Sequence, residues 1–221
     1  MENRHFDKEL SNLNESLLKM GLSVEESIFK CVEALEKRDG NIAKSLIEND
    51  SNIDKMELEI DEKCLKLIAL YQPMAVDLRF ITTGIMIATD LERMGDLSVD
   101  IAQRVIDLAD KPLPKPLVDL PKMADVIKTM IRKSLEAFVK HNTSIAKEII
   151  VLEDQADDYR DLITDELVQL MVKNSEAIPQ ALLLILIVRH LERIADHAAN
   201  IAEDVVYMVD AEVIKHKKRQ K

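Results

Sequence analysis

The sequence predicts an all-α protein in which six long helices form two pseudo-symmetric antiparallel three-helix bundles. Three observations support this fold class. The 221 residues are 47% hydrophobic and 32% charged with only four glycines, a composition typical of long helices. Apolar residues recur three or four positions apart along six stretches, as they do on the buried face of a helix. One proline-rich segment separates the first three stretches from the last three.

The first three helices are expected over residues 6–35, 53–71 and 87–108. The first carries an apolar residue at every turn and ends at the turn pair Asp39-Gly40. The second ends before Pro73, because a proline restricts the residue that precedes it. The third continues the same apolar spacing as far as Leu108. Together they predict a first repeat over residues 1–110.

The segment 111–121 is predicted to be a linker, because it contains four of the six prolines. The last three helices are expected over 123–138, 145–170 and from Pro179 to Met208, where proline suits a first helical turn. The second repeat then covers residues 122–214. A basic tail, 215–221, follows it.

A charged motif occurs twice, one hundred positions apart, on the last helix of each repeat. Leu91-Glu92-Arg93-Met94-Gly95-Asp96 returns as Leu191-Glu192-Arg193-Ile194-Ala195-Asp196. The middle helices carry the same acid spacing, with Glu57 and Asp61 in the first repeat and Glu153 and Asp157 in the second. Two acids four positions apart share a helix face and repel each other. A chain that repeats this arrangement on four helices is predicted to hold positive charge there.

Each acid pair directly follows a core position, so it lies along the edge of the buried stripe. Because the middle and last helices of an antiparallel bundle are neighbours, these edges can meet. Hard oxygen donors without a thiolate suit Mg²⁺, Mn²⁺, Ca²⁺ or iron and argue against structural zinc. The predicted ligands are Glu57, Asp61, Glu92, Asp96 and Asp100 in the first repeat, and Glu153, Asp157, Glu192, Asp196 and Asn200 in the second.

Two alternatives to such a metal-binding protein stay open. The acids can instead be solvated helix faces on a metal-free scaffold, with Arg93 and Arg193 supplying salt bridges. A di-iron oxidase of the ferritin-like type requires Glu-x-x-His motifs, and Ala195 stands where the second motif would need histidine. His190 and His197 flank that motif without histidine counterparts in the first repeat. A helix-surface role is the more common one for such residues.

Composition excludes other functional classes. A formal net charge of −11 and 3% aromatic residues disfavour nucleic acid as a partner. Glycine-rich phosphate loops, nucleophilic triads and Cys-x-x-Cys pairs are absent from the sequence, so we expect no enzymatic activity. Cys31 and Cys64 lie on apolar helix faces and are expected to be buried thiols. With no apolar leader and no apolar run of membrane length, the protein is expected to be cytoplasmic. A peripheral membrane protein that uses its basic tail is a further alternative.

The segment Gln72-Pro73-Met74-Ala75-Val76-Asp77-Leu78-Arg79, together with the two Glu-Arg-x-small-Asp motifs, closely resembles the PhoU family of phosphate-signalling regulators. The resemblance covers about residues 4 to 214. It implies a pair of three-helix bundles, usually dimeric, in a cytoplasmic protein that partners recruit to the inner face of the membrane. It also implies negative regulation of the phosphate-starvation response and of phosphate uptake. The implied partners are the ATPase subunit of the phosphate ABC transporter and a sensor histidine kinase.

The resemblance further implies bound metal, either multinuclear iron or zinc, or Mn²⁺ or Mg²⁺, on the acid motifs named above. Two departures from the family pattern concern the second repeat, where Ala195 replaces the usual glycine and Asn200 replaces the acid found at Asp100. Asp77 and Arg79 belong to the family's hallmark at the start of the third helix. They are read either as the ordinary charges of a helix N-terminus or as a partner-binding or dimer surface.

Overall fold

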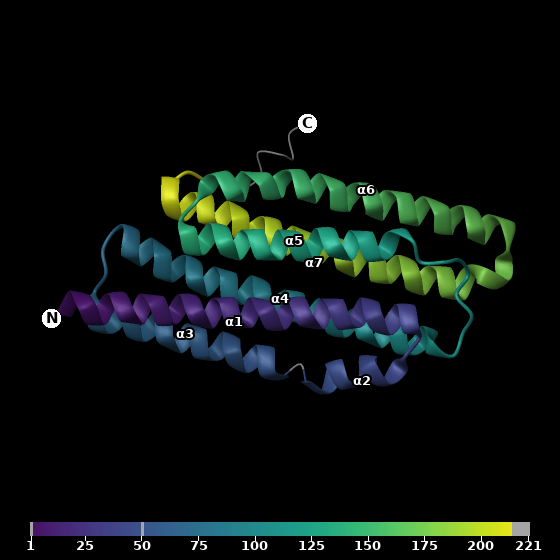
Figure 1. Cartoon of the computed structure of the whole chain (residues 1–221), viewed down its shortest axis with the longest axis horizontal. Coiled ribbons are helices and arrows are strands. Elements are labelled where there is room, and N and C mark those ends of the chain that lie inside the picture. Colours follow the sequence, from purple (N-terminus) through teal and green to yellow (C-terminus); the bar gives the residue numbers. More distant parts are fainter. Residues whose placement is uncertain (1, 50, 214–221) are drawn as a thin grey trace.

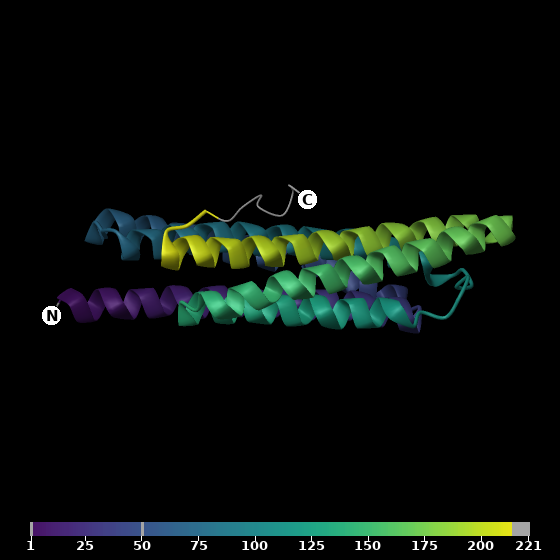
Figure 2. The same cartoon turned by 90° about the horizontal axis from the view of Figure 1, so that it is seen from above.

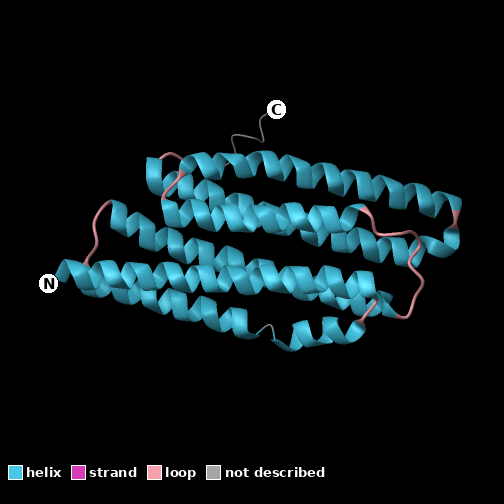
Figure 3. Cartoon of the chain, in the orientation of Figure 1, coloured by secondary structure: helices cyan, strands magenta, loops and turns pink. Residues whose placement is uncertain are grey.

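The computed structural model describes residues 2–49 and 51–213, and all of the secondary structure in these ranges is helical. Figure 3 shows long helices joined by short loops. The predicted all-α fold class is therefore confirmed. The basic tail 215–221 lies outside the described residues. The helices are α1 (Glu2–Lys37), α2 (Gly40–Asn49), α3 (Ser51–Tyr71), α4 (Val76–Ala109), α5 (Asp119–Lys140), α6 (Thr143–Lys173), the 3₁₀ turn η1 (Ser175–Ala177) and α7 (Ile178–Asp210).

The break after the first helix is confirmed at Asp39, but a short helix that was not predicted follows it at once. The Asp39 carboxylate caps α2, because its Oδ1 accepts hydrogen bonds from the backbone N–H groups of Asn41 (2.9 Å) and Ile42 (3.4 Å). Arg38 occupies the left-handed region with φ 55°. Its guanidinium donates to the carbonyls of Ala109 and Lys111, so the end of α1 is tied to the end of α4.

The proline-rich connection is shorter than predicted. Helix α5 begins at Asp119, and Pro121 lies in its first turn. Backbone N–H groups in a first turn have no intrahelical acceptor, so proline costs nothing there. The connection between the two repeats therefore covers residues 110–118.

The helices form two layers (Figures 1 and 2). Helices α4 and α7 lie side by side in one layer, and α1 and α5 lie side by side in the other. Helix α3 packs against α1 and α4 at one edge of the molecule, and α6 packs against α5 and α7 at the opposite edge. Each repeat is thus a three-helix bundle, and the two bundles share a broad interface.

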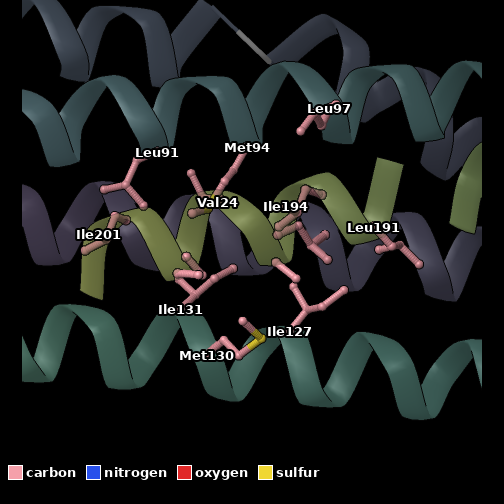
Figure 4. Packing of buried hydrophobic residues seen from close by; sticks show 14 of the residues in the cluster. Val24, Leu91, Met94, Leu97, Ile127, Met130, Ile131, Leu191, Ile194 and Ile201 are labelled. Atoms are coloured by element: carbon pink, nitrogen blue, oxygen red, sulfur yellow. The ribbon is translucent and has the colours of Figure 1, made fainter. Parts of the chain in front are cut away.

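The core is continuous across that interface. Figure 4 shows Met94 of α4 and Ile194 of α7 packing together with Met130 of α5 and Val24 of α1, and all four side chains are fully buried. Met94 and Ile194 occupy corresponding positions of the repeated motif. The apolar members of the two motifs therefore hold the bundles together, while their acidic members are left at the edges.

Two polar contacts define the relative direction and the register of α4 and α7. Asp90 pairs with His197 at 2.8 Å, and both side chains are nearly buried. Arg79, at the start of α4, donates from Nε to the carbonyl of Met208 (3.0 Å) near the end of α7. Residue numbers rise on one helix as they fall on the other, so the two helices are antiparallel. Within the described ranges, no helix is long and apolar enough to cross a membrane.

Candidate metal centre

The first acid-rich region lies beside the contact of Ile53 of α3 with Gly95 of α4. The buried side chain of Ile53 packs directly on Gly95, where an added Cβ atom would lie only 3.1 Å from the Ile53 Cδ1 atom. A residue with a side chain would force the neighbouring isoleucine to shift. Glycine therefore allows this helix contact, and it brings the residues that follow Ile53 next to the acids of α4.

Three carboxylates meet at this contact. One oxygen each of Asp54, Glu92 and Asp96 lies within 4.8 Å of the other two. Asp54 and Asp96 are exposed and Glu92 is partly buried. Desolvation raises the pKa of Glu92 most, and the negative charges of Asp96, Glu57 and Asp54 raise it further. We call Asp54, Glu57, Glu92 and Asp96 the first-half cluster.

Of the five predicted ligands of the first repeat, two belong to the converging carboxylates, Glu92 and Asp96, and three do not, Glu57, Asp61 and Asp100. The Oε1 atom of Glu57 accepts a hydrogen bond from the Thr89 hydroxyl (3.2 Å). The three-carboxylate group includes neither Asp61 nor Asp100. Asp61 is one helical turn farther along α3, and its buried Oδ1 atom has no hydrogen-bond partner within residues 2–49 and 51–213. Asp100 is turned toward α7, where its Oδ2 atom is 3.9 Å from His190 Nδ1.

Asp54 was missed by sequence reasoning. Its only sequence signal is its position three residues before Glu57, which puts both acids on one face of a helix. Asp54 could be identified as a ligand only from the register between α3 and α4, which the contact of Ile53 with Gly95 sets.

The second acid-rich region contains a basic side chain. Nη1 of Arg160 donates to Asp157 Oδ1 (2.8 Å) and to Glu192 Oε1 (2.7 Å). Its Nε atom donates to Asp161 Oδ1 (2.8 Å). Arg160 thus joins α6 to α7 through the acids themselves. We call Glu153, Asp157, Glu192 and Asp196 the second-half cluster.

The pKa values show that these four acids share one electrostatic environment. Desolvation, followed by the charges of Glu192, Glu153 and Asp157, raises the pKa of Asp196 to about 6. Desolvation also raises the pKa of Asp157, while Arg160 opposes that rise. The hydrogen bond to Asp161 is the largest of the effects that raise the pKa of Arg160 itself.

The remaining residues singled out in the motifs have other positions. Arg93 and Arg193 are exposed, and among the described residues neither forms an ion pair. His197 pairs with Asp90 across the interface between the bundles. Asn200 is partly buried on α7, one turn beyond Asp196. Cys31 and Cys64 are buried and unbridged, as expected, and desolvation raises the pKa of each thiol to about 12.

The first-half cluster fits a hard cation. It offers carboxylate oxygens from two helices and contains no histidine and no thiolate, a donor set suited to Mg²⁺, Mn²⁺ or Ca²⁺. Among the residues that the structure describes, no lysine or arginine forms an ion pair with Asp54, Glu92 or Asp96. The second-half cluster has similar oxygens, but a guanidinium already bonds two of them.

The family hallmark forms the exposed turn from α3 into α4. Met74 and Val76 are 80% and 53% exposed, and the backbone of Ala75 lies in the left-handed region with φ 48°. Asp77 is exposed in the first turn of α4. Arg79 is partly buried and bonded to the carbonyl of Met208. Of the two hallmark charges, Asp77 is the one available at the surface.

Comparisons with known proteins agree with this architecture. The family model described as "PhoU domain" matches twice, over residues 17–105 and 120–205. A relative from Aquifex aeolicus, named phosphate-specific transport system accessory protein PhoU homolog, is 40% identical over 209 residues, which are 95% of each chain.

Two solved structures are similar to the whole fold. The crystal structure of PhoU from Pseudomonas aeruginosa is 35% identical with a TM-score of 0.88, covering 94% of this chain and 100% of that one. The phosphate transport system regulatory protein PhoU from Streptococcus pneumoniae is 35% identical with a TM-score of 0.89, covering 95% and 99%. These likenesses extend over both bundles and both acid-rich regions.

Proposed function

The chain belongs to the PhoU family, and on that premise we propose that it is a non-enzymatic regulator of phosphate transport. In this proposal it represses the phosphate-starvation response and phosphate uptake by linking the phosphate ABC transporter to a sensor histidine kinase. The observation that carries the proposal is the match of both repeats to the family, with relatives named for the phosphate transport system.

A genetic complementation experiment tests this role. The chain is expressed in a bacterium whose own PhoU-family gene has been deleted, together with a reporter driven by a phosphate-starvation promoter. We expect the reporter to be repressed in phosphate-rich medium and released on starvation. An empty vector and the relative from the host serve as controls. Constitutive reporter activity despite normal protein levels would contradict the proposal.

We propose that the first-half cluster binds a divalent or iron-type metal ion. A bound cation would neutralise the converging carboxylates and bridge α3 to α4. Asp54, Glu92 and Asp96 would supply the ligands, and Glu57 would add negative charge beside them. The raised pKa of Glu92 supports this assignment, because the same crowding that disfavours its ionised form is relieved by a cation. Elemental analysis of protein purified without chelator, compared with the Glu92→Gln/Asp96→Asn double variant, tests the site.

We propose the hallmark turn as the surface that meets a transporter or kinase subunit. Met74, Val76 and Leu78 are exposed there beside the charge of Asp77, a mixture of apolar and charged groups typical of a contact surface. The Asp77→Ala/Met74→Ser variant should keep its melting temperature and lose repression in the complementation assay. Arg79→Ala should instead lower the melting temperature, because it removes the bond to Met208.

Association into homodimers belongs to the same proposal. Leu58 and Leu65 on α3 are both more than 60% exposed and are seven positions apart, so they share one outer face of the helix. Sedimentation equilibrium of the wild type and of the Leu58→Ser/Leu65→Ser variant tests whether this face joins two copies. If the variant dimerises with the same affinity as the wild type, the face that carries Leu58 and Leu65 is not the dimer interface.

A further inference from the structure

The two acid clusters occupy equivalent positions in the sequence, and their middle helices differ at several positions, two of which bear on what the acids can bind. Glu57 matches Glu153, and Asp61 matches Asp157, 96 positions later. The same offset places Ile150 at the position of Asp54, and Arg160 at the position of Cys64. The second half therefore lacks the carboxylate of Asp54 and has the guanidinium of Arg160. It also has Asp161 in place of Leu65, and the Asp161 carboxylate accepts a hydrogen bond from that guanidinium.

Both differences act on the same group of oxygens. Asp54 is one of the three residues whose oxygens converge in the first half, and Ile150 offers no ligand in its place. The Cys64 thiol is buried in the core, whereas the Arg160 side chain is 26% exposed and reaches the acids. The first difference removes a negative charge one turn before Glu153, and the second places a positive charge one turn after Asp157.

The Arg160 guanidinium lies among the acids and donates hydrogen bonds to three of them. Its Nη1 atom is shared between Asp157 of α6 and Glu192 of α7, and its Nε atom is held by Asp161. A planar guanidinium with several charge-assisted hydrogen bonds is well ordered and permanently charged. A metal ion would have to displace the guanidinium before it could bind Asp157 Oδ1 or Glu192 Oε1.

We propose that Arg160 serves as the built-in counter-cation of the second-half cluster and excludes metal from it, so that the chain binds metal only in its first half. This inference rests on the proposed metal function of the first-half cluster. The two repeats then share a fold but differ in their cation. The first-half cluster binds a metal ion from solution, and the second-half cluster is paired with the guanidinium of Arg160.

Manganese stoichiometry tests the inference with four variants of the full chain. Mn²⁺ is added to chelator-treated protein, and bound metal is counted after gel filtration and by Mn²⁺ electron paramagnetic resonance. Glu92→Gln/Asp96→Asn should lose the bound Mn²⁺, whereas Glu192→Gln/Asp196→Asn should bind as much as the wild type. Arg160→Gln should gain additional Mn²⁺. Arg132→Gln, which removes an arginine that is doubly bonded to Glu25 outside both clusters, should gain none.

The outcomes separate this inference from the proposed function. If the Glu192→Gln/Asp196→Asn variant binds less Mn²⁺ than the wild type, the second half also binds metal. That result would overturn the inference, although the chain would still be a metal-binding protein. A wild type without Mn²⁺ beside an Arg160→Gln variant that binds it would support the exclusion of metal by Arg160 and refute the proposed first-half site. An Arg160→Gln variant that is folded by circular dichroism and gains no Mn²⁺ would overturn the inference. If that variant does not fold, the Glu192→Gln/Asp196→Asn comparison still decides.

Discussion

The two halves of this protein place acids at the same positions of the same helices but neutralise them in different ways. In the first half, oxygens of Asp54, Glu92 and Asp96 converge, and no described lysine or arginine forms an ion pair with them. In the second half, Arg160 bonds two of the four acids. A pseudo-symmetric scaffold therefore does not imply pseudo-symmetric chemistry, because one side chain on a middle helix can supply positive charge to the acids of one half alone.

The helix interfaces show where the two halves remain alike. The contact of α3 with α4 uses Gly95, and the buried Ala195 stands at the corresponding position of α7. The apolar positions of the motif pack into one shared core around Met94 and Ile194. The differences that change charge lie at the polar edges, on the middle helices α3 and α6. Each of the following predictions separates the halves at those positions.

Removal of metal should have the largest effect. A ligand present at 100 times its dissociation constant stabilises the folded state by about 2.7 kcal/mol. For a chain of this size this corresponds to roughly 5–10 °C in melting temperature. We expect EDTA to lower the melting temperature of Mn²⁺-loaded wild type and of Glu192→Gln/Asp196→Asn by this amount. Glu92→Gln/Asp96→Asn should show no shift, and an equal shift in both double variants would mean that the halves are alike.

Loss of Arg160 should have the next largest effect. Arg160→Gln leaves Asp157 and Glu192 without their shared donor, and an unpaired, partly buried acceptor costs about 1–3 kcal/mol. We expect a lower midpoint in urea unfolding, measured in EDTA, with partial recovery when Mn²⁺ is added. Arg132→Gln is the matched control and should be milder, because Lys128 still lies 3.5 Å from Glu25. If added Mn²⁺ does not restore any stability to Arg160→Gln, a metal ion does not take the place of the missing guanidinium, and the prediction is wrong.

Substitution of Asp54 should weaken metal binding and spare the fold. Asp54→Asn removes a charge from the three converging carboxylates, and even the loss of a group that only supports a ligand reduces affinity by about tenfold or more. The Asp54 side chain is exposed, so the melting temperature in EDTA should hardly change. Titration calorimetry with Mn²⁺ measures the effect, and Asp61→Asn provides a control of equal charge outside the convergent group. Equal losses in the two variants would show that Asp54 has no special position.

The smallest expected effect is a pH dependence in the second half. The pKa of Asp196 is about 6 in the folded protein, above its ordinary value, so its ionisation disfavours the folded state. This cost is absent at pH values below the unfolded pKa, grows as the pH rises toward 6, and is complete at pH 7. Asp196→Asn should therefore be more stable than the wild type at pH 7 in EDTA. Its advantage should shrink as the pH falls toward 4, and a constant advantage across that range would refute the assignment.

Much of this arrangement could be predicted from the sequence. Apolar spacing located all six long helices, although α4 begins at Val76 and not at the predicted residue 87. The position of each acid beside a core residue put the acids at the helix edges. The short helix α2 was missed because its ten residues give few turns of pattern, and its capping residue Asp39 was taken only as part of a turn.

Contacts between helices were harder to predict. In the alternative of solvated acid faces, Arg93 and Arg193 were the salt-bridge partners. Both are exposed, and Arg160 of α6 bonds Glu192 of α7 instead. His197 similarly pairs with Asp90 of the other bundle. Such pairs depend on the rotation and register of one helix relative to another. Periodicity within a single helix does not fix either quantity.

Anomalous diffraction from crystals grown with Mn²⁺ tests the difference between the halves most directly. The account predicts an anomalous peak among Asp54, Glu92 and Asp96, with the Arg160 guanidinium still bonded to Asp157 and Glu192. A peak of equal height among Glu153, Asp157, Glu192 and Asp196, with Arg160 turned away into solvent, would contradict it.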